Sequence, residues 1–117
     1  MTAADDIRAW LQGLPELAGW RLQFGRWIDS SKTDRYAVLR PVGGGMASLL
    51  REPRFTLLLV GRQGDAETQA YDTAYAVAEA SRTYTGDLVQ LQAGEPVPST
   101  THDGRPTAEV AITTIAN

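Results

Sequence analysis

The chain has 117 residues, of which 43% are hydrophobic and 21% are charged, and its formal net charge at pH 7 is -3. These values lie near the averages for globular domains, so one hydrophobic core is expected and neither a disordered nor a fibrous chain is predicted. The absence of cysteine excludes disulfides, thiolate metal sites, iron-sulfur clusters and a cysteine nucleophile.

The start of the chain lacks the features of an export signal. Asp5 and Asp6 fall where a secretory signal carries basic residues, and no long apolar core follows them. The longest strongly apolar run, residues 57–60, is far shorter than the ~20 residues that a membrane helix needs. We therefore expect a soluble protein that folds in a cytoplasm.

The charges are distributed unevenly along the chain. Residues 35–62 hold five arginines against one glutamate, which gives a net charge of +4, whereas residues 63–117 hold two arginines against eight carboxylates, which gives -6. The two segments are expected to attract each other, either within one subunit or between subunits. Contacts of the second kind use two different surfaces and close into rings when the rotation allows.

The first predicted element is a short amphipathic helix over residues 2–11. Thr2 is placed to cap its N-terminus, and Asp5 lies in its first turn, where a carboxylate is favourable. Gly13 and Pro15 end it. Its apolar side chains recur at helical spacing on one side, at Ile7, Trp10, Leu11 and Leu14.

Two strands are predicted next. Apolar and polar residues alternate over residues 20–24, which indicates a half-buried strand. The polar stretch 29–34 has the length and composition of a hairpin turn, and it leads into a second strand over residues 36–40. Pro41 is expected to stop this strand because it has no N–H to donate to a ladder.

Residues 43–53 fit no regular element as a whole. They begin with three glycines, so a loop is predicted, with a short helical turn at residues 46–50. Residues 55–60 are apolar at nearly every position, as in a central strand that is covered on both faces. The chain is then expected to turn at residues 61–65.

The main helix is predicted to run from Asp65, as its N-cap, to about Tyr84, with Gly86 as the stop. Small residues form the stripe that faces the sheet, at Ala70, Ala74, Val77, Ala78 and Ser81, with Tyr71 and Tyr75 on its flank. The solvent-facing side carries charged residues, at Glu67, Asp72, Glu79 and Arg82.

Two alternating strands end the chain, at residues 89–93 and 108–113. Between them, residues 94–106 contain three prolines and predict a long exposed hairpin connection with a turn at Asp103 and Gly104.

The predicted order is helix, three strands, helix and two strands. Because the strands follow one another in runs and do not alternate with helices, we expect one α+β domain over residues 1–117. Its sheet is expected to be mixed or antiparallel with about five strands, and one long and one short helix are expected to pack on one face.

No catalytic or metal site is predicted. His102 is the only histidine, and it lies in the proline-rich connection without the further ligands of a zinc site or an oriented serine. Asp29 and Asp34 lack the spacing of a calcium loop. The glycines at 43–45 are not followed by Lys-Ser or Lys-Thr, so they do not form a phosphate loop. We expect neither an enzyme nor a cofactor.

The glycine-rich segment has two interpretations, an ordinary surface loop or a flexible segment that orders against a partner. Arg51 and Arg54 are placed to contact phosphates, but an acidic chain without an aromatic ladder is a weak nucleic-acid binder. The predicted subunit or partner interface comprises Arg40, Gly43, Gly44, Gly45, Met46, Arg51 and Arg54.

Several features follow one another over most of the chain. A strand ending in Leu39-Arg40-Pro41 precedes the glycine-rich loop, the apolar strand at 55–60 and the helical segment YDTAYAVAEA at 71–80. The last strands are separated by Gly94-Glu95-Pro96 and Gly104-Arg105-Pro106. In this order the chain resembles the tail terminator and minor tail protein families of long-tailed bacteriophages.

The resemblance implies a virion protein, assembled in the bacterial cytoplasm, that forms a hexameric ring on the head-proximal end of the tail tube. The implied partners are copies of itself, the major tail tube protein and a head-tail connector protein, with DNA passing through the lumen as cargo. No cofactor and no membrane are implied. The alternatives are a head-tail connector or stopper, a tail tube subunit, and a small-molecule-binding or enzymatic α+β domain with a pocket beneath residues 43–53.

Overall fold

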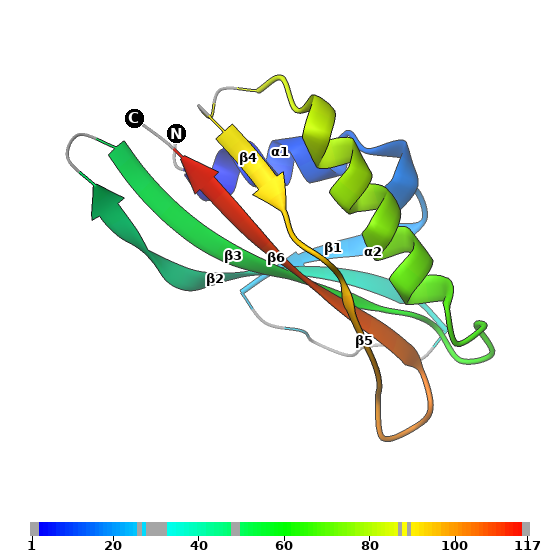
Figure 1. The fold of residues 1–117 in the computed structure, drawn as a ribbon. Coiled ribbons are helices and arrows are strands. Elements are labelled where there is room, and N and C mark those ends of the chain that lie inside the picture. Colours follow the sequence, from blue (N-terminus) through cyan, green and yellow to red (C-terminus); the bar gives the residue numbers. More distant parts are fainter. Residues whose placement is uncertain are drawn as a thin grey trace.

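In the part of the chain that the structure describes, six strands form one mixed sheet and two helices pack on one of its faces (Figure 1). This computed structural model describes residues 3–25, 27, 33–47, 50–86, 88 and 90–115, with the backbone alone for residues 3, 43–47 and 50–52. The elements are α1 (Ala3–Gln12), β1 (Trp20–Phe24), β2 (Arg35–Ala47), β3 (Leu50–Val60), α2 (Gln69–Ala80), β4 (Gln90–Ala93), β5 (Val97–Thr100) and β6 (Pro106–Ile115). The predicted α+β class is confirmed.

The strands lie in the order β1-β2-β3-β6-β4, so β3 is central. Leu57 of β3 is paired with Leu39 of β2 on one side and with Val110 of β6 on the other. β5 pairs with residues 106–109 of β6, on the side away from β3, and β4 pairs with residues 112–115. β4 and β5 therefore form one interrupted edge of the sheet.

The main core lies between the sheet and the helices. Leu57 and Leu59 are fully buried there, and the helices contribute Ile7, Leu11, Ala70, Ala74 and Val77. On the opposite face, Trp27 and Leu58 pack against a smaller cluster formed by Tyr36, Val38 and Val60. The prediction of a strand at 55–60 that is covered on both faces is confirmed.

Both helices follow the predicted amphipathic patterns. Small residues let α2 lie close to the sheet, and Ala70, Ala74, Val77 and Ser81 are buried, while the four predicted solvent-facing residues are exposed. α2 ends at Ala80 and continues as a 3-10 turn, Ser81–Thr83, close to the predicted end. Within the described residues, neither helix has the length and apolar character needed to cross a membrane.

The predicted hairpin between the first two strands is wrong, because β1 and β2 pair in parallel, from Trp20 opposite Arg35 to Phe24 opposite Leu39. Gly25 adopts φ +99°, which favours glycine, and the chain turns away there. Ten residues, 25–34, can span roughly 33 Å, enough to return along a five-residue strand of about 17 Å. A polar segment of this composition is compatible with a tight turn and also with a longer connection that returns to the start of a parallel strand. Composition therefore did not predict whether the two strands pair in parallel or antiparallel.

Pro41 does not stop β2, and residues 43–47 and 50–53 lie in strands instead of the predicted loop. β2 runs on to Ala47 and pairs antiparallel with β3 as far as Ala47 opposite Leu50. A register shift between Pro41 and Gly44 places the proline beside a bulge, where a missing ladder hydrogen bond is tolerated. The predicted helical turn at 46–50 is wrong for the strand residues Met46, Ala47 and Leu50, and residues 48–49 lie outside the described chain.

The predicted exposed connection at 94–106 contains the strand β5, which sequence alternation did not reveal because all four of its residues are exposed. The predicted turn at Asp103 and Gly104 is confirmed. Gly104 adopts φ +85°, and its N–H donates to the Thr101 carbonyl at 3.1 Å. The following Arg105 is 2% exposed, and its guanidinium lies over the Trp27 ring, 5.0 Å from the ring centroid.

Candidate functional site

A two-stranded hairpin extends beyond the rest of the sheet (Figure 1). We call residues 42–47 of β2 and 50–53 of β3 the hairpin arm. β1 pairs with β2 only over residues 35–39, and β6 pairs with β3 only over residues 54–60, so neither strand flanks the arm in the described chain. An isolated hairpin is at best marginally stable in water, so the arm is a candidate interaction site.

The base of the arm is anchored. The Thr114 hydroxyl, on a residue that is 2% exposed, donates to the Pro53 carbonyl at 2.9 Å. The bulge between Pro41 and Gly44 changes the local twist of the ribbon where it leaves the sheet. A fixed base with unpaired strand edges beyond it suits a projecting contact element.

The structure brings the predicted interface residues to this one region. Gly44, Gly45 and Met46 are paired with Pro53, Glu52 and Arg51, respectively, and Gly43 lies in the bulge. Arg40 and Arg54 lie at the base, opposite Thr56 and Thr113. The side-chain positions of residues 43–46 and of Arg51 lie outside the described structure, so their contacts remain a prediction.

The two described arginines at the base differ in their surroundings. Arg40 lies 3.8 Å from Glu109 of β6, and its buried Nε has no hydrogen-bond partner in the described structure. Arg54 is exposed, and the described residues place no carboxylate within ion-pair distance of it. Arg54 is therefore the more available of the two for a contact with another molecule.

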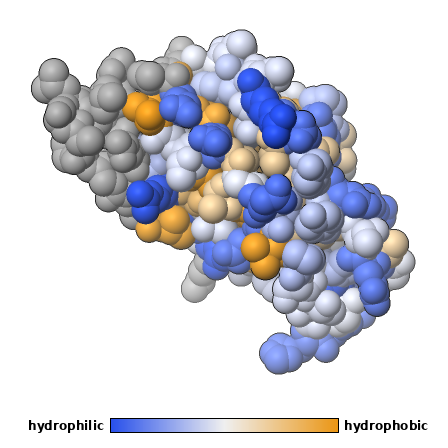
Figure 2. Space-filling model, viewed as in Figure 1, coloured by the Kyte–Doolittle hydropathy of each residue, from blue (hydrophilic) through white to orange (hydrophobic). Residues whose placement is uncertain are grey.

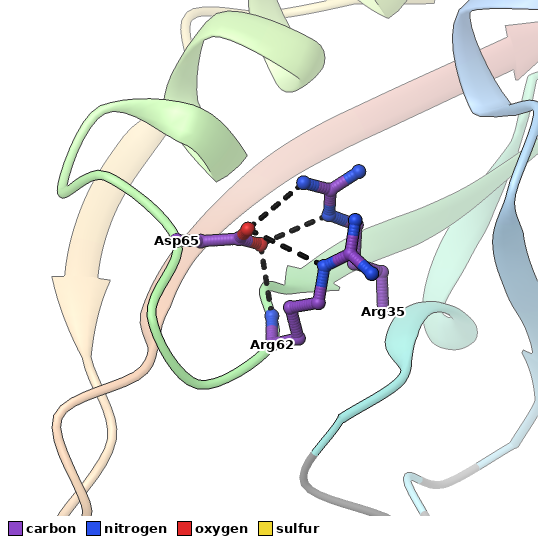
Figure 3. A network of polar contacts seen from close by, with 3 residues as sticks. All are labelled: Arg35, Arg62 and Asp65. Atoms are coloured by element: carbon purple, nitrogen blue, oxygen red, sulfur yellow. Dashed lines mark hydrogen bonds and ion pairs between the residues drawn. The ribbon is translucent and has the colours of Figure 1, made fainter.

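A network of charged residues that sequence reasoning missed lies near the N-terminal end of α2 (Figure 3). Arg35, at the start of β2, donates two hydrogen bonds to Asp65, from Nε at 2.9 Å and from Nη2 at 2.8 Å. The Arg62 backbone N–H donates to the same carboxylate at 3.0 Å, and the Arg62 Nε lies 3.5 Å from it. The network ties the β3–α2 turn to the start of β2.

Asp65 is therefore not the helix cap that the sequence predicted. α2 begins after Thr68, which makes no side-chain cap hydrogen bond. The Arg35 hydrogen bonds, with smaller contributions from Arg62, lower the pKa of the Asp65 carboxyl from 3.8 to about 2. No local signal identifies this pair, because the two residues lie 30 positions apart.

Asp65→Asn is expected to lower the free energy of unfolding at pH 7 by about 2 kcal/mol, because the lowered pKa reflects preferential stabilisation of the carboxylate in the folded chain. This stability is present above about pH 4 and is lost as the pH falls toward 2. Urea unfolding of both proteins at pH 7 and pH 2 measures the effect, and the difference between them should narrow in acid. A pH-independent difference would contradict this assignment.

Asp34→Asn provides the matched control. Asp34 pairs with Arg21 at 3.1 Å, but both side chains are well exposed. An exposed pair contributes at most about 1 kcal/mol, so this variant should unfold nearly as the unmodified chain does.

Among the ion pairs that the structure describes, the basic and acidic segments meet within one subunit in two places, at Asp65 and at Glu109. The prediction of attraction within a subunit is thus confirmed for Arg35, Arg40 and Arg62. Arg54 takes part in none of these ion pairs, and the side chain of Arg51 is not described. The prediction of attraction between subunits now depends on these two arginines.

Of the residues considered for metal chemistry, His102 and Asp34 lie in the described structure, and Asp29 lies outside it. His102 is exposed, and no group of three metal-binding side chains occurs among the described residues. A shallow groove of about 220 Å³ lies near the base of the arm, and Arg54 is its one charged lining residue. The groove is lined by Arg54, Gln90, Gln92, Thr113, Thr114 and Ile115. Figure 2 shows hydrophobic residues scattered among hydrophilic ones on the face in view.

The described residues thus form a small α+β structure with an anchored hairpin that no other described strand flanks. The model of the phage tail termination protein family matches residues 1–117, and the chain belongs to that family. A search of curated proteins found no significant match. Membership confirms the resemblance seen in the sequence and makes the chain a structural component of the phage tail.

Proposed function

We propose that the protein forms a homo-oligomeric ring, a hexamer, that caps the head-proximal end of the tail tube. The ring stops the addition of further tube protein and presents its other face to the head-tail connector protein. DNA passes through the lumen as cargo. This function requires one face that is complementary to the tube and another that does not accept tube protein, and it needs no catalytic residue or cofactor.

The observation that carries this proposal is the hairpin arm, whose strand edges have no neighbour in the described part of the subunit. A contact with a second copy would cover these edges and stabilise both the arm and the assembly. Membership of the family supports the tail location of the assembly. A head-tail connector, a stopper and a tail tube subunit are the alternatives within the virion.

Native mass spectrometry of the purified protein tests the ring. The proposal expects a closed species of six copies, alone or after the addition of tail tubes. A chain that stays monomeric at all concentrations, and also fails to assemble on tubes, would rule out a self-assembling terminator.

The double variant Arg51→Glu and Arg54→Glu is expected to weaken ring formation by about tenfold or more, because like charges then replace attractive ones at the contact. The domain should stay folded, since Arg54 is exposed and Arg51 lies in the arm, which no other strand flanks among the described residues. Native mass spectrometry measures the oligomer, and circular dichroism checks the fold. Normal assembly and normal infection by phage carrying both changes would show that these arginines are not at the interface.

The matched control reverses Arg8 and Arg21, which changes the net charge by the same amount. Arg8 lies over the Phe24 ring at 5.6 Å and Arg21 pairs with Asp34, so both lie beside β1, which pairs with β2 only before the arm begins. This control should assemble as the unmodified protein does. A loss of assembly in both variants would point to net charge instead of a defined contact.

A further inference from the structure

A polar groove of about 480 Å³ lies between the end of α2 and the edge strand β4. Ser81, Arg82 and Tyr84 line the helical wall, and Gln90, Leu91 and Gln92 line the strand wall. Tyr84 also fixes the segment that leads into β4, because its hydroxyl accepts a hydrogen bond from the Leu88 N–H at 3.1 Å. The groove is open to solvent and has hydrogen-bonding groups on both walls.

The edge of β4 faces this groove. The Gly94 N–H donates toward β6, to the Ala111 carbonyl at 2.9 Å, whereas the Ala93 N–H donates in the other direction, to the Ser81 hydroxyl at 3.3 Å. Backbone groups alternate in direction along an antiparallel strand, so the N–H and C=O of Leu91 point outward. The described residues give these two groups no backbone partner on that side.

The other described edges of the sheet are less suited to accept a strand. β5 contains Pro98, which has no N–H, and its four residues lie outside the groove. On β1, the guanidinium of Arg8 lies over the Phe24 ring at the end of the edge strand. β4 is thus the edge where an added strand finds both free backbone groups and a groove for its side chains.

The hairpin arm complements this edge in two ways. The outer edges of its two strands pair with no other strand among the described residues, so their N–H and C=O groups can bond to an added strand. The hairpin and its base carry Arg51 and Arg54. The segment beside the groove, residues 79–95, carries three acids against one arginine, Arg82, which lies 3.8 Å from Glu79. Charge and backbone hydrogen bonding therefore favour the same contact.

From these features we infer that the groove beside β4 binds the hairpin arm of a second copy of the chain. One strand of the arm adds to β4, and Arg51 in the arm and Arg54 at its base approach the acids beside the groove. The contact joins two different surfaces, as a closed ring requires. This inference rests on the proposed ring and specifies which surface receives the arm.

Crosslinking between two single-cysteine proteins tests the contact, because the natural chain has no cysteine. One protein carries Met46→Cys in the arm, and the other, with a mass tag, carries Gln92→Cys in the groove. A mixture of the two is treated with a short bis-maleimide, so that an arm-to-groove product can form only between subunits. The control mixture replaces the groove variant with Glu67→Cys, an exposed site before α2.

The arm-to-groove product is expected to form at least about tenfold faster than the control product, since assembly holds the two sites at high effective concentration. If native mass spectrometry shows rings but the two products form equally slowly, the arm binds elsewhere and the groove assignment is wrong, while the ring stands. If the unmodified protein forms no ring, alone or on tubes, the proposed function and this inference both fail.

Discussion

Removal of the tip of the hairpin arm is expected to abolish ring formation and leave the domain folded. The variant replaces residues 46–51 with Asn-Gly, a pair that favours a two-residue hairpin turn between Gly45 and Glu52, which are paired in the structure. The tip has no flanking strand among the described residues, so its loss should change the free energy of unfolding by only about 1 kcal/mol or less. The variant retains the bulge and the Thr114 hydrogen bond to Pro53.

Native mass spectrometry and thermal unfolding together measure this result. The expected outcome is a monomer at concentrations where the unmodified protein is a ring, with an unfolding midpoint near that of the unmodified monomer. Val97→Ser serves as a control, because it changes an exposed residue of β5 outside the arm and the groove. Rings of normal size from the shortened protein would show that the tip makes no assembly contact.

Leu57→Ala is expected to lower the free energy of unfolding by about 2–5 kcal/mol. Leu57 is fully buried at the centre of the sheet, between Leu39 and Val110, and it faces the helices. The substitution removes buried apolar surface and leaves a cavity that a closely packed layer fills only in part. For a small domain this is a large share of a total stability of about 5–15 kcal/mol.

Urea unfolding of the arm-shortened protein is the suitable measurement, because ring formation would otherwise add to the apparent stability. Leu58→Ala is the matched control. Leu58 is the next residue on β3, but it is only half-buried and lies on the opposite face, with the smaller cluster. An equal loss from both substitutions would contradict the assignment of the main core to the helical face.

Periodicity predicted the elements whose side chains pack against the core. The strand at 55–60, the stripe of small residues on α2 and the buried positions of β6 all agree with the structure, because burial on one face imposes a pattern that a single sequence displays. β5 escaped detection for the same reason, since exposed residues carry no such pattern.

Pairing between distant segments was not predictable in this way. The parallel contact of β1 with β2 and the continuation of β2 past Pro41 depend on which strand lies alongside, which local composition does not encode. Residues 43–45 are glycines and give no alternation, so their place in a strand is evident only from the partner strand. The Arg35–Asp65 pair is a contact of the same long-range kind.

The sequence singled out the residues of the predicted interface but not the form of the backbone that carries them. The glycines and arginines marked residues 40–54 as unusual, and the structure brings them together at an extended hairpin instead of a loop. No sequence pattern predicted the groove beside β4. The groove forms between the end of α2 at Ala80 and the strand β4, which begins at Gln90, so it depends on how these two elements pack. Ser81 was predicted only as a buried residue, and its hydrogen bond to Ala93 was not.

Electron microscopy of purified tail tubes incubated with the protein tests the proposed role most directly. The expected images show a six-fold ring on one end of each tube, and capped tubes that no longer lengthen when tube protein is added. The arm-shortened variant should leave the tubes bare. Tubes that carry no cap, or that incorporate the protein repeatedly along their length, would contradict a terminator that acts as a closed ring.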